Sequence, residues 1–254
     1  KQLYRRKIPE EGWPVEYFLT EEQEMIRELA ARIAQEKVKP VAAELDEKEE
    51  FPWEIMKLLG ESDLFAVWVP EEYGGLGGGV LEQALVVEEL SRACSGVAVS
   101  YAASGLGSFP ILLYGSHEQK ARYMPDIASG KRLAAFALTE ANAGSDVSSM
   151  NTTAVRDGDD YILNGTKQWI TNGGEAEIYT VVAVTDKSKG ARGSSAFIVE
   201  KGTPGLSFGK KEKKLGIRAS STREVIFENC RIPKENLLGR EGLGFIVAMK
   251  TFDK

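Results

Sequence analysis

The sequence of 254 residues contains few of the side chains from which metal sites, catalytic triads and disulfide frameworks are built. Its single histidine, His117, argues against a histidine-rich metal site and against a Ser-His-Asp triad. Its two cysteines, Cys94 and Cys230, lie far apart and outside any C-x-x-C pair, which is typical of reduced, partly buried thiols. We therefore expect neither a metal centre nor a disulfide framework.

The chain also lacks a surplus of positive charge and an apolar targeting segment. Lys and Arg number 32 against 38 Asp and Glu, and the net charge of −6 argues against a nucleic-acid-binding protein. No apolar run follows the basic residues 1–6, so we expect no signal peptide. With 43% hydrophobic and 28% charged residues, the composition is that of a soluble globular protein of one or two domains.

One stretch, from Ala93 to Ser116, contains no formal charge and is long enough to cross a bilayer. Its glycines, its serines and Pro110 dilute its apolar character. We therefore expect a buried helix in a soluble core and no membrane span. A helix without charge on any side can also line a cavity.

Hydrophobic spacing indicates helices in the first half of the chain and short strands in the second. Thr20 and Gln23 form a predicted capping box, and the expected helices cover residues 20–40, 53–60, 80–92, 93–116 and 118–129. After Gly130, β-prone runs alternate with turn dipeptides such as Asn164-Gly165, which favours a small antiparallel barrel or sandwich. The expected strands include residues 151–156, 161–163, 178–184, 196–200 and 224–227, and a last helix follows at 242–252.

The 26 glycines do not build either of the common nucleotide-binding loops. The run Gly74–Gly79 lacks the Gly-Lys-Ser/Thr ending of a P-loop, and Val80 stands where the third glycine of G-x-G-x-x-G would be. We interpret this run as a conformational loop between helices. A nucleotide cofactor would have to bind without a Rossmann fingerprint.

Two other motifs suit a flavin-like ligand. The segment 136–146 (FALTEANAGSD) leaves a strand and enters a loop of small residues, whose hydroxyls and free backbone N–H groups can cradle a pyrophosphate; a capped turn is the structural alternative. The segment 167–174 (KQWITNGG) places Trp169 near the Thr171 hydroxyl, which suits a flat heteroaromatic ring; a core Trp beside a turn is the alternative.

Together and in this order, the two motifs resemble those of the acyl-CoA dehydrogenase family of flavoproteins. The likeness extends over essentially the whole chain, including the loop 69–77 and the closing strands at 215–222 and 225–233. The resemblance implies an α+β fold with an all-helical N-terminal domain over residues 1–131 and a small antiparallel β-barrel domain over 132–240. Residues 241–254 would be the first helix of a C-terminal helical bundle that is otherwise absent.

The resemblance also implies that FAD lies between the β domain and the helices. Carried over by position, the cofactor-binding residues are Phe136, Leu138, Thr139, Gly144, Ser145, Trp169, Ile170 and Thr171. Thr139 would bond the edge of the isoalloxazine ring, Thr171 would reach its N5 side, and Trp169 would pack against it. The residues implied to contact the acyl-CoA substrate are Tyr101, Ala102, Leu106, Ser145, Phe252 and Asp253.

The implied reaction is the FAD-dependent dehydrogenation of an acyl-CoA thioester to the 2-enoyl-CoA, an oxidoreductase step of fatty acid metabolism. Electrons would pass to an electron-transfer flavoprotein. A buried carboxylate suits the α-proton base, and the family places it after the position of Lys254, so we expect no catalytic base within this chain. Glu140 is expected to cap or anchor the loop that follows it.

Three alternatives stay open from the sequence. An acyl-CoA oxidase or an enoyl-CoA reductase would be a variant of the same chemistry. A non-catalytic flavin- or CoA-binding fragment, or a scaffold, belongs to a different class. The family further implies a homotetramer for the full-length protein. The lack of a leader fits an enzyme of the bacterial cytoplasm or, alternatively, a processed one of the mitochondrial matrix.

Overall fold

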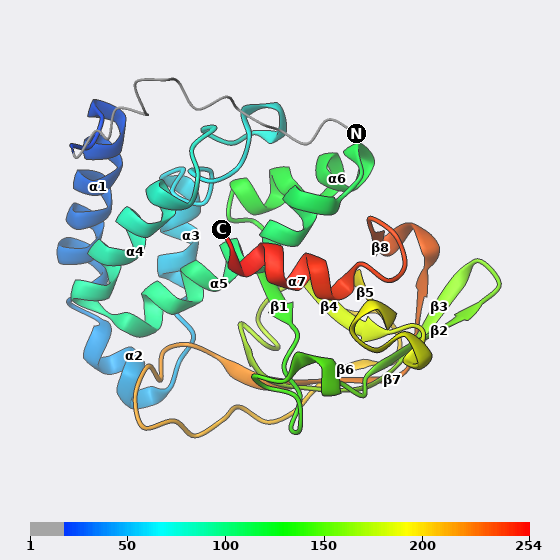
Figure 1. The fold of residues 1–254 in the computed structure, drawn as a ribbon. Coiled ribbons are helices and arrows are strands. Elements are labelled where there is room, and N and C mark those ends of the chain that lie inside the picture. Colours follow the sequence, from blue (N-terminus) through cyan, green and yellow to red (C-terminus); the bar gives the residue numbers. More distant parts are fainter. Residues whose placement is uncertain (1–17) are drawn as a thin grey trace.

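The computed structural model describes residues 18–254, so the basic start of the chain at residues 1–6 lies outside the described residues. Helices form one half of the molecule and a sheet the other (Figure 1). The helices before the sheet are α1 (Glu21–Ile33), α2 (Ala42–Lys48), α3 (Trp53–Glu61), α4 (Val80–Ala93), α5 (Ser95–Tyr114) and α6 (His117–Ala128).

Capping residues set where two of these helices begin. At α1, the Thr20 hydroxyl accepts from the Gln23 backbone N–H at 3.2 Å and the Gln23 side chain accepts from the Thr20 N–H at 3.0 Å. The predicted capping box is therefore confirmed. Ser116 and Gln119 build the same arrangement at the start of α6. A short π-helix, η1 (Ala34–Val38), continues α1.

The uncharged stretch forms α5, the central helix of the structure. Within the described residues it is the one helix long and apolar enough to cross a membrane, and 67% of its most apolar stretch is buried inside the protein. α5 contacts α4 and α6 on one side and β1 and β4 on the other. Its Gly107 allows this approach, since a Cβ there would lie 2.5 Å from the Ala135 backbone nitrogen. This is the packing of a core helix.

The second half of the chain forms one eight-stranded sheet. Its strands are β1 (Ala134–Ala137), β2 (Thr153–Asp157), β3 (Asp160–Thr171), β4 (Ile178–Val184), β5 (Ser194–Glu200), β6 (Leu206–Phe208), β7 (Thr222–Pro233) and β8 (Leu237–Leu238). The order along the sheet is β6-β7-β3-β2-β4-β5-β8, and β1 pairs with β4 outside this path.

The sheet is open, so the expected closed barrel is wrong. The short strands β6 and β8 are its two ends; β6 pairs with β7 and β8 pairs with β5, and the two ends do not pair with each other. In the middle, β2 and β4 are joined only through Thr153 and Val184, because β1 occupies the rest of that edge of β4. Both contacts are parallel, so the sheet is also not purely antiparallel.

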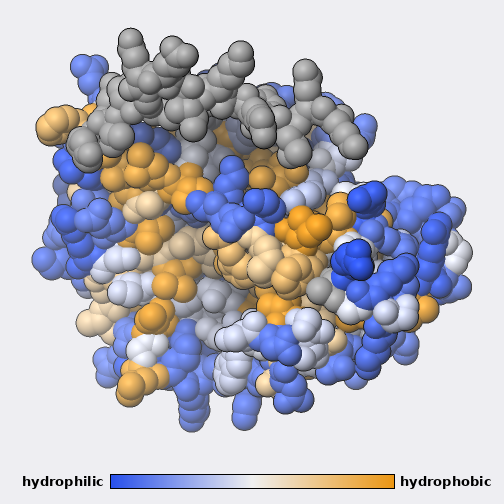
Figure 2. All heavy atoms as spheres, in the orientation of Figure 1, coloured by the Kyte–Doolittle hydropathy of each residue, from blue (hydrophilic) through white to orange (hydrophobic). Residues whose placement is uncertain are grey.

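The last helix, α7 (Gly244–Phe252), crosses between the helical half and the sheet (Figure 1). It contacts α5 and β5, and Gly244 lies so close to β5 that a Cβ would be 2.6 Å from the Ser195 nitrogen. In the same orientation, hydrophobic side chains gather in the middle of the molecular face, surrounded by hydrophilic ones (Figure 2). The exposed side chains of α7 include Ile246 and Phe252.

Both cysteines are free thiols, as expected. Cys230 is buried in the sheet, and burial raises its pKa to about 11. A thiol with so high a pKa carries little thiolate at neutral pH, so Cys230 is a packing residue.

Candidate functional site

One apolar pocket of about 380 Å³ lies where α5, β1, β3 and α7 meet. The expected site residues that line it are Ala102, Leu106, Phe136, Leu138, Thr139, Trp169, Ile170, Thr171 and Phe252. At its edge the rings of Phe136 and Phe252 meet nearly at right angles, with centroids 5.7 Å apart. The structure thus brings together segments that are far apart in the chain around one cavity of ligand size.

Two threonines supply the polar groups of this pocket. Thr139 follows β1 and Thr171 ends β3, and both are half-buried. Within residues 18–254 neither hydroxyl has a protein partner, so both are available to a bound molecule. No Asp, Glu or His side chain lines the pocket in the part of the chain that the structure describes.

A β-bulge turns Trp169 out of the sheet. Lys167 pairs with Val225 and Ile170 with Arg223, so β3 carries one more residue than β7 between these pairs. Lys167 and Ile170 are both buried, and Trp169 between them is 56% exposed. Without the extra residue, Trp169 would point to the same side as Lys167.

Trp169 also adopts a strained backbone conformation. Its φ of 61° lies in the left-handed region, which a bulky residue seldom occupies. Such strain persists where the surrounding structure enforces it, and it concentrates at functional sites. The bulge and the positive φ together present the indole ring to the pocket.

A buried ion pair ties down the loop that follows β1. Lys167 Nζ lies 2.8 Å from Glu140 Oε1 and 2.9 Å from the Leu138 carbonyl oxygen. The Glu140 carboxylate also accepts from the backbone N–H groups of Asn151 and Thr152, at 2.6 and 2.9 Å. Glu140 therefore anchors its loop, as expected from the sequence.

For each residue of this pair, burial and ion pairing shift the pKa in opposite directions. Burial would raise the pKa of Glu140, but the Lys167 charge and the hydrogen bonds to the carboxylate together hold it below its ordinary value. Burial lowers the pKa of Lys167, and Glu140 opposes that shift. Glu140 is thus an ionised anchor at neutral pH.

Four of the expected site residues lie outside the pocket lining. The ring of Tyr101 is fully buried, and its hydroxyl donates to the Leu64 carbonyl at 2.7 Å, on a face of α5 that points into the helical domain. Asp253 ends α7 at the surface and pairs with Lys250 at 3.1 Å. Gly144 and Ser145 lie in the exposed loop after β1.

The sequence reading missed two lining residues, Val99 and Ala103. With Ala102 and Leu106 they recur at i, i+3, i+4 and i+7, the spacing of one helix face. This spacing is visible in the sequence. Tyr101 does not belong to it, so helix geometry places Tyr101 on a different face of α5.

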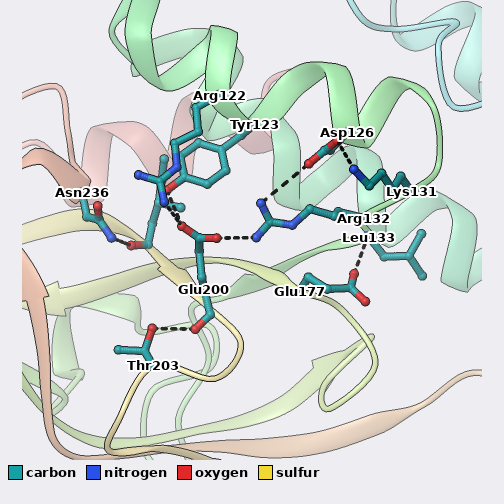
Figure 3. A network of polar contacts seen from close by, with 11 residues as sticks. Arg122, Tyr123, Asp126, Lys131, Arg132, Leu133, Glu177, Glu200, Thr203 and Asn236 are labelled. Carbon is teal, nitrogen blue, oxygen red and sulfur yellow. Dashed lines mark hydrogen bonds and ion pairs between the residues drawn. The ribbon is translucent and has the colours of Figure 1, made fainter.

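A polar network joins α6 and the entry to β1 to the end of β5 (Figure 3). Glu200, at the end of β5, accepts from Arg122 at 2.5 Å, from Arg132 at 2.6 Å and from the Tyr123 hydroxyl at 3.0 Å. Burial would raise the pKa of Glu200, but these partners hold it below its ordinary value. Glu177 accepts from the Leu133 N–H at 2.9 Å and fixes the entry to β1.

Comparisons with known proteins agree with this arrangement. Residues 20–131 match the family model of the acyl-CoA dehydrogenase N-terminal domain, and residues 135–230 match that of the middle domain. A short-chain specific acyl-CoA dehydrogenase of Clostridium acetobutylicum is 47% identical over 240 residues, which cover 94% of this chain and 63% of the relative.

Two further relatives match at similar levels. An acryloyl-CoA reductase (NADH) of Anaerotignum propionicum is 46% identical over 94% of this chain and 61% of its own. A mitochondrial short-chain specific acyl-CoA dehydrogenase of Mus musculus is 47% identical over 92% of this chain and 57% of its own. The chain therefore spans less than two thirds of the length of these relatives.

Solved structures share the fold. Butyryl-CoA dehydrogenase from Megasphaera elsdenii superposes with a TM-score of 0.91 at 42% identity, covering 94% of this chain and 63% of that one. A chain from a study of the electron transferring flavoprotein of Acidaminococcus fermentans gives 0.92 at 48%, with the same coverage. An acyl-CoA dehydrogenase complexed with FAD from Bacillus anthracis gives 0.86 at 43%, covering 92% of this chain and 41% of that one. The chain belongs to the acyl-CoA dehydrogenase family, with the family's N-terminal and middle domains in residues 20–131 and 135–230.

Proposed function

We propose that the protein binds FAD in the pocket between α5, β1 and β3 and takes part in the α,β-dehydrogenation of an acyl-CoA thioester to the 2-enoyl-CoA. The observation that carries this proposal is the convergence of the two motif segments, 136–146 and 167–174, on one apolar pocket. The relative from Bacillus anthracis, a complex with FAD, supports the choice of cofactor.

The residues of the pocket fit a flavin. Trp169 offers an exposed indole face, and the hydroxyls of Thr139 and Thr171 have no protein partner among the described residues. In the exposed loop, a Cβ on Gly144 would meet no atom within 4 Å, so packing within the described protein does not require glycine there. The loop backbone can therefore be approached closely by a pyrophosphate.

Each residue expected at the site from the sequence has a role in this proposal. When bound, FAD supplies the acceptor for the hydride that leaves the β-carbon. Phe136, Leu138, Thr139, Gly144, Ser145, Trp169, Ile170 and Thr171 would hold it. Leu106 and Ala102 would line the acyl chain, with Phe252 and Asp253 toward the CoA arm and Ser145 near the thioester. Tyr101 would support the α5 lining of the pocket without contacting the substrate, because its ring is fully buried.

The proposed substrates are short acyl thioesters. The relatives from Clostridium acetobutylicum and Mus musculus are named short-chain specific, and the Megasphaera elsdenii protein is a butyryl-CoA dehydrogenase. The apolar lining would lower the local polarity around the reacting carbons, which strengthens any electrostatic stabilisation of enolate character.

The α-proton needs a base that the pocket lining does not supply. Since no carboxylate lines the pocket in residues 18–254, we propose that the base comes from outside this chain segment, as the greater length of the relatives allows. We further propose electron-transfer flavoprotein as the partner, a homotetrameric assembly, and a location in the bacterial cytoplasm or the mitochondrial matrix.

A reductase working in the opposite direction is the second candidate. The relative from Anaerotignum propionicum, an acryloyl-CoA reductase (NADH), favours it at 46% identity. Both directions use the same flavin pocket. In the full-length protein, which would supply the base, anaerobic mixing with butyryl-CoA and separately with an enoyl-CoA plus NADH distinguishes them by which one changes the flavin absorbance.

The proposal is tested by the visible absorbance of FAD added to the purified protein. We expect a bound-flavin spectrum that survives gel filtration, and its loss in Thr139→Trp, because the larger ring fills the part of the pocket proposed for the flavin. Leu81→Trp is the matched control: Leu81 is 52% exposed on α4, outside the pocket, and the variant should bind as the unaltered protein does. A colourless protein after gel filtration, or equal binding by Thr139→Trp, contradicts the proposal.

A further inference from the structure

The ion pair between Glu140 and Lys167 is unusual because it is buried. The Lys167 side chain is fully inaccessible and that of Glu140 is 8% exposed. Taking two charges out of water is expensive, and well-packed apolar side chains in their place are often as stable or more so. The stability of the sheet alone therefore does not explain why this lysine lies in its interior.

The pair instead joins the start and the end of one loop to β3. Lys167 Nζ bonds the Leu138 carbonyl, where the chain leaves β1, and the Glu140 carboxylate. That carboxylate bonds the N–H groups of Asn151 and Thr152, where the chain enters β2. Both ends of the loop 138–152 are thus fixed to one point on β3.

The same stretch of β3 carries a further part of the pocket lining. The residue after Lys167, Gln168, donates its backbone N–H to the Thr139 carbonyl at 2.8 Å. Next comes Trp169, displaced outward by the bulge. Leu138, Thr139 and Trp169 all line the pocket, so the position of Leu138 and Thr139 relative to Trp169 depends on what Lys167 holds.

We propose that Lys167 and Glu140 are positioning residues, which set the position of Leu138 and Thr139 relative to Trp169 and so the affinity of the pocket for the flavin. This inference rests on the proposed function for the identity of the ligand. Neither residue lines the pocket, so both act through the backbone that they hold.

The test uses a double variant that removes both charges, Lys167→Met with Glu140→Gln. The single change Lys167→Met leaves an unpaired buried carboxylate and can unfold the protein. The double variant leaves none, so we expect a melting temperature close to that of the unaltered protein. We also expect FAD to dissociate about tenfold more readily, because the Leu138 carbonyl has lost its tether.

A second readout needs no ligand. Hydrogen exchange at the backbone amides of Gln168 and Val184, measured without added cofactor, should be faster in the double variant, since their acceptors, the carbonyls of Thr139 and Thr152, lie on the loop that the pair holds. Lys234→Met is the matched control, because it removes an exposed ion pair with Asp159 in the same domain, and it should change neither readout.

The outcomes separate the two claims. If the unaltered protein does not retain FAD, the proposed function fails, and the exchange rates still decide whether the pair positions the loop. If the unaltered protein retains FAD and the double variant binds it equally well, the positioning role is wrong while the proposed function stands. Unchanged exchange at Gln168 and Val184 overturns the inference in either case.

Discussion

At the scale of single residues, Thr171 illustrates a polar group placed for a ligand and not for the fold. Its hydroxyl lines the pocket without a protein partner among the described residues. Thr171→Val keeps the shape of the side chain, so we expect a melting temperature within a few degrees of the unaltered protein. In the full-length protein, which would supply the α-proton base, anaerobic bleaching of bound flavin by butyryl-CoA should slow roughly 10²-fold, the effect typical of losing one preorganised donor. Thr166→Val, at an exposed position on the same strand, is the control; equal bleaching rates in both variants would refute the role.

Asn172, the next residue, serves the fold. Its buried side-chain amide donates to the Ser100 carbonyl at 2.9 Å and to the Ala134 carbonyl at 3.3 Å, joining α5 to β1. Its φ of 61° suits Asn better than other non-glycine residues. Asn172→Ala removes these buried hydrogen bonds between α5 and β1 and should lower the free energy of unfolding by about 2 kcal/mol. Chemical denaturation measures this, and a change below about 0.5 kcal/mol would contradict it.

At the scale of elements, the loop 138–152 should loosen in acid. The pKa of Glu140 lies below its ordinary value of 4.5 in the folded protein, so its ionised form stabilises the fold above that pH. This contribution is lost as the pH falls through the folded-state pKa. The difference in melting temperature between the unaltered protein and Glu140→Gln should therefore shrink as the pH is lowered below about 4.5. A difference that stays constant from pH 7 to pH 3.5 would show that the carboxylate charge contributes nothing.

Short-range sequence patterns predicted the helices, caps and motif segments whose structure is set by residues close to one another in the sequence. The capping box at Thr20, the uncharged core helix and the two motif segments all follow from short-range spacing. The two-residue strand β8 has no such pattern, and the bulge before Ile170 depends on how β7 pairs. Whether the sheet closes is decided by edges far apart in sequence, which is why the barrel was expected and an open sheet is found.

At the scale of the whole molecule, the pocket exists only while the helical half and the sheet stay together. The Glu200 network makes one such connection, with the Arg132 side chain 20% and the Glu200 side chain 28% exposed. Glu200→Gln weakens the hydrogen bonds to both arginines and should lower the free energy of unfolding by about 1 to 2 kcal/mol. Asp157→Asn, in an exposed pair with Arg231, should change it by less than about 0.5 kcal/mol. Equal decreases in the free energy of unfolding of the two variants would show that the Glu200 hydrogen bonds stabilise the protein no more than an exposed ion pair does.

The central claim is that FAD lies against Trp169 in the pocket between the two halves, and the quenching of tryptophan fluorescence by FAD tests it most directly. In a titration of the unaltered protein, bound FAD should quench a large share of the emission. Trp169→Phe keeps an aromatic wall, so it should still bind FAD, as the visible flavin spectrum reports, but most of the quenching should be gone. Quenching of the same size in Trp169→Phe would contradict the account.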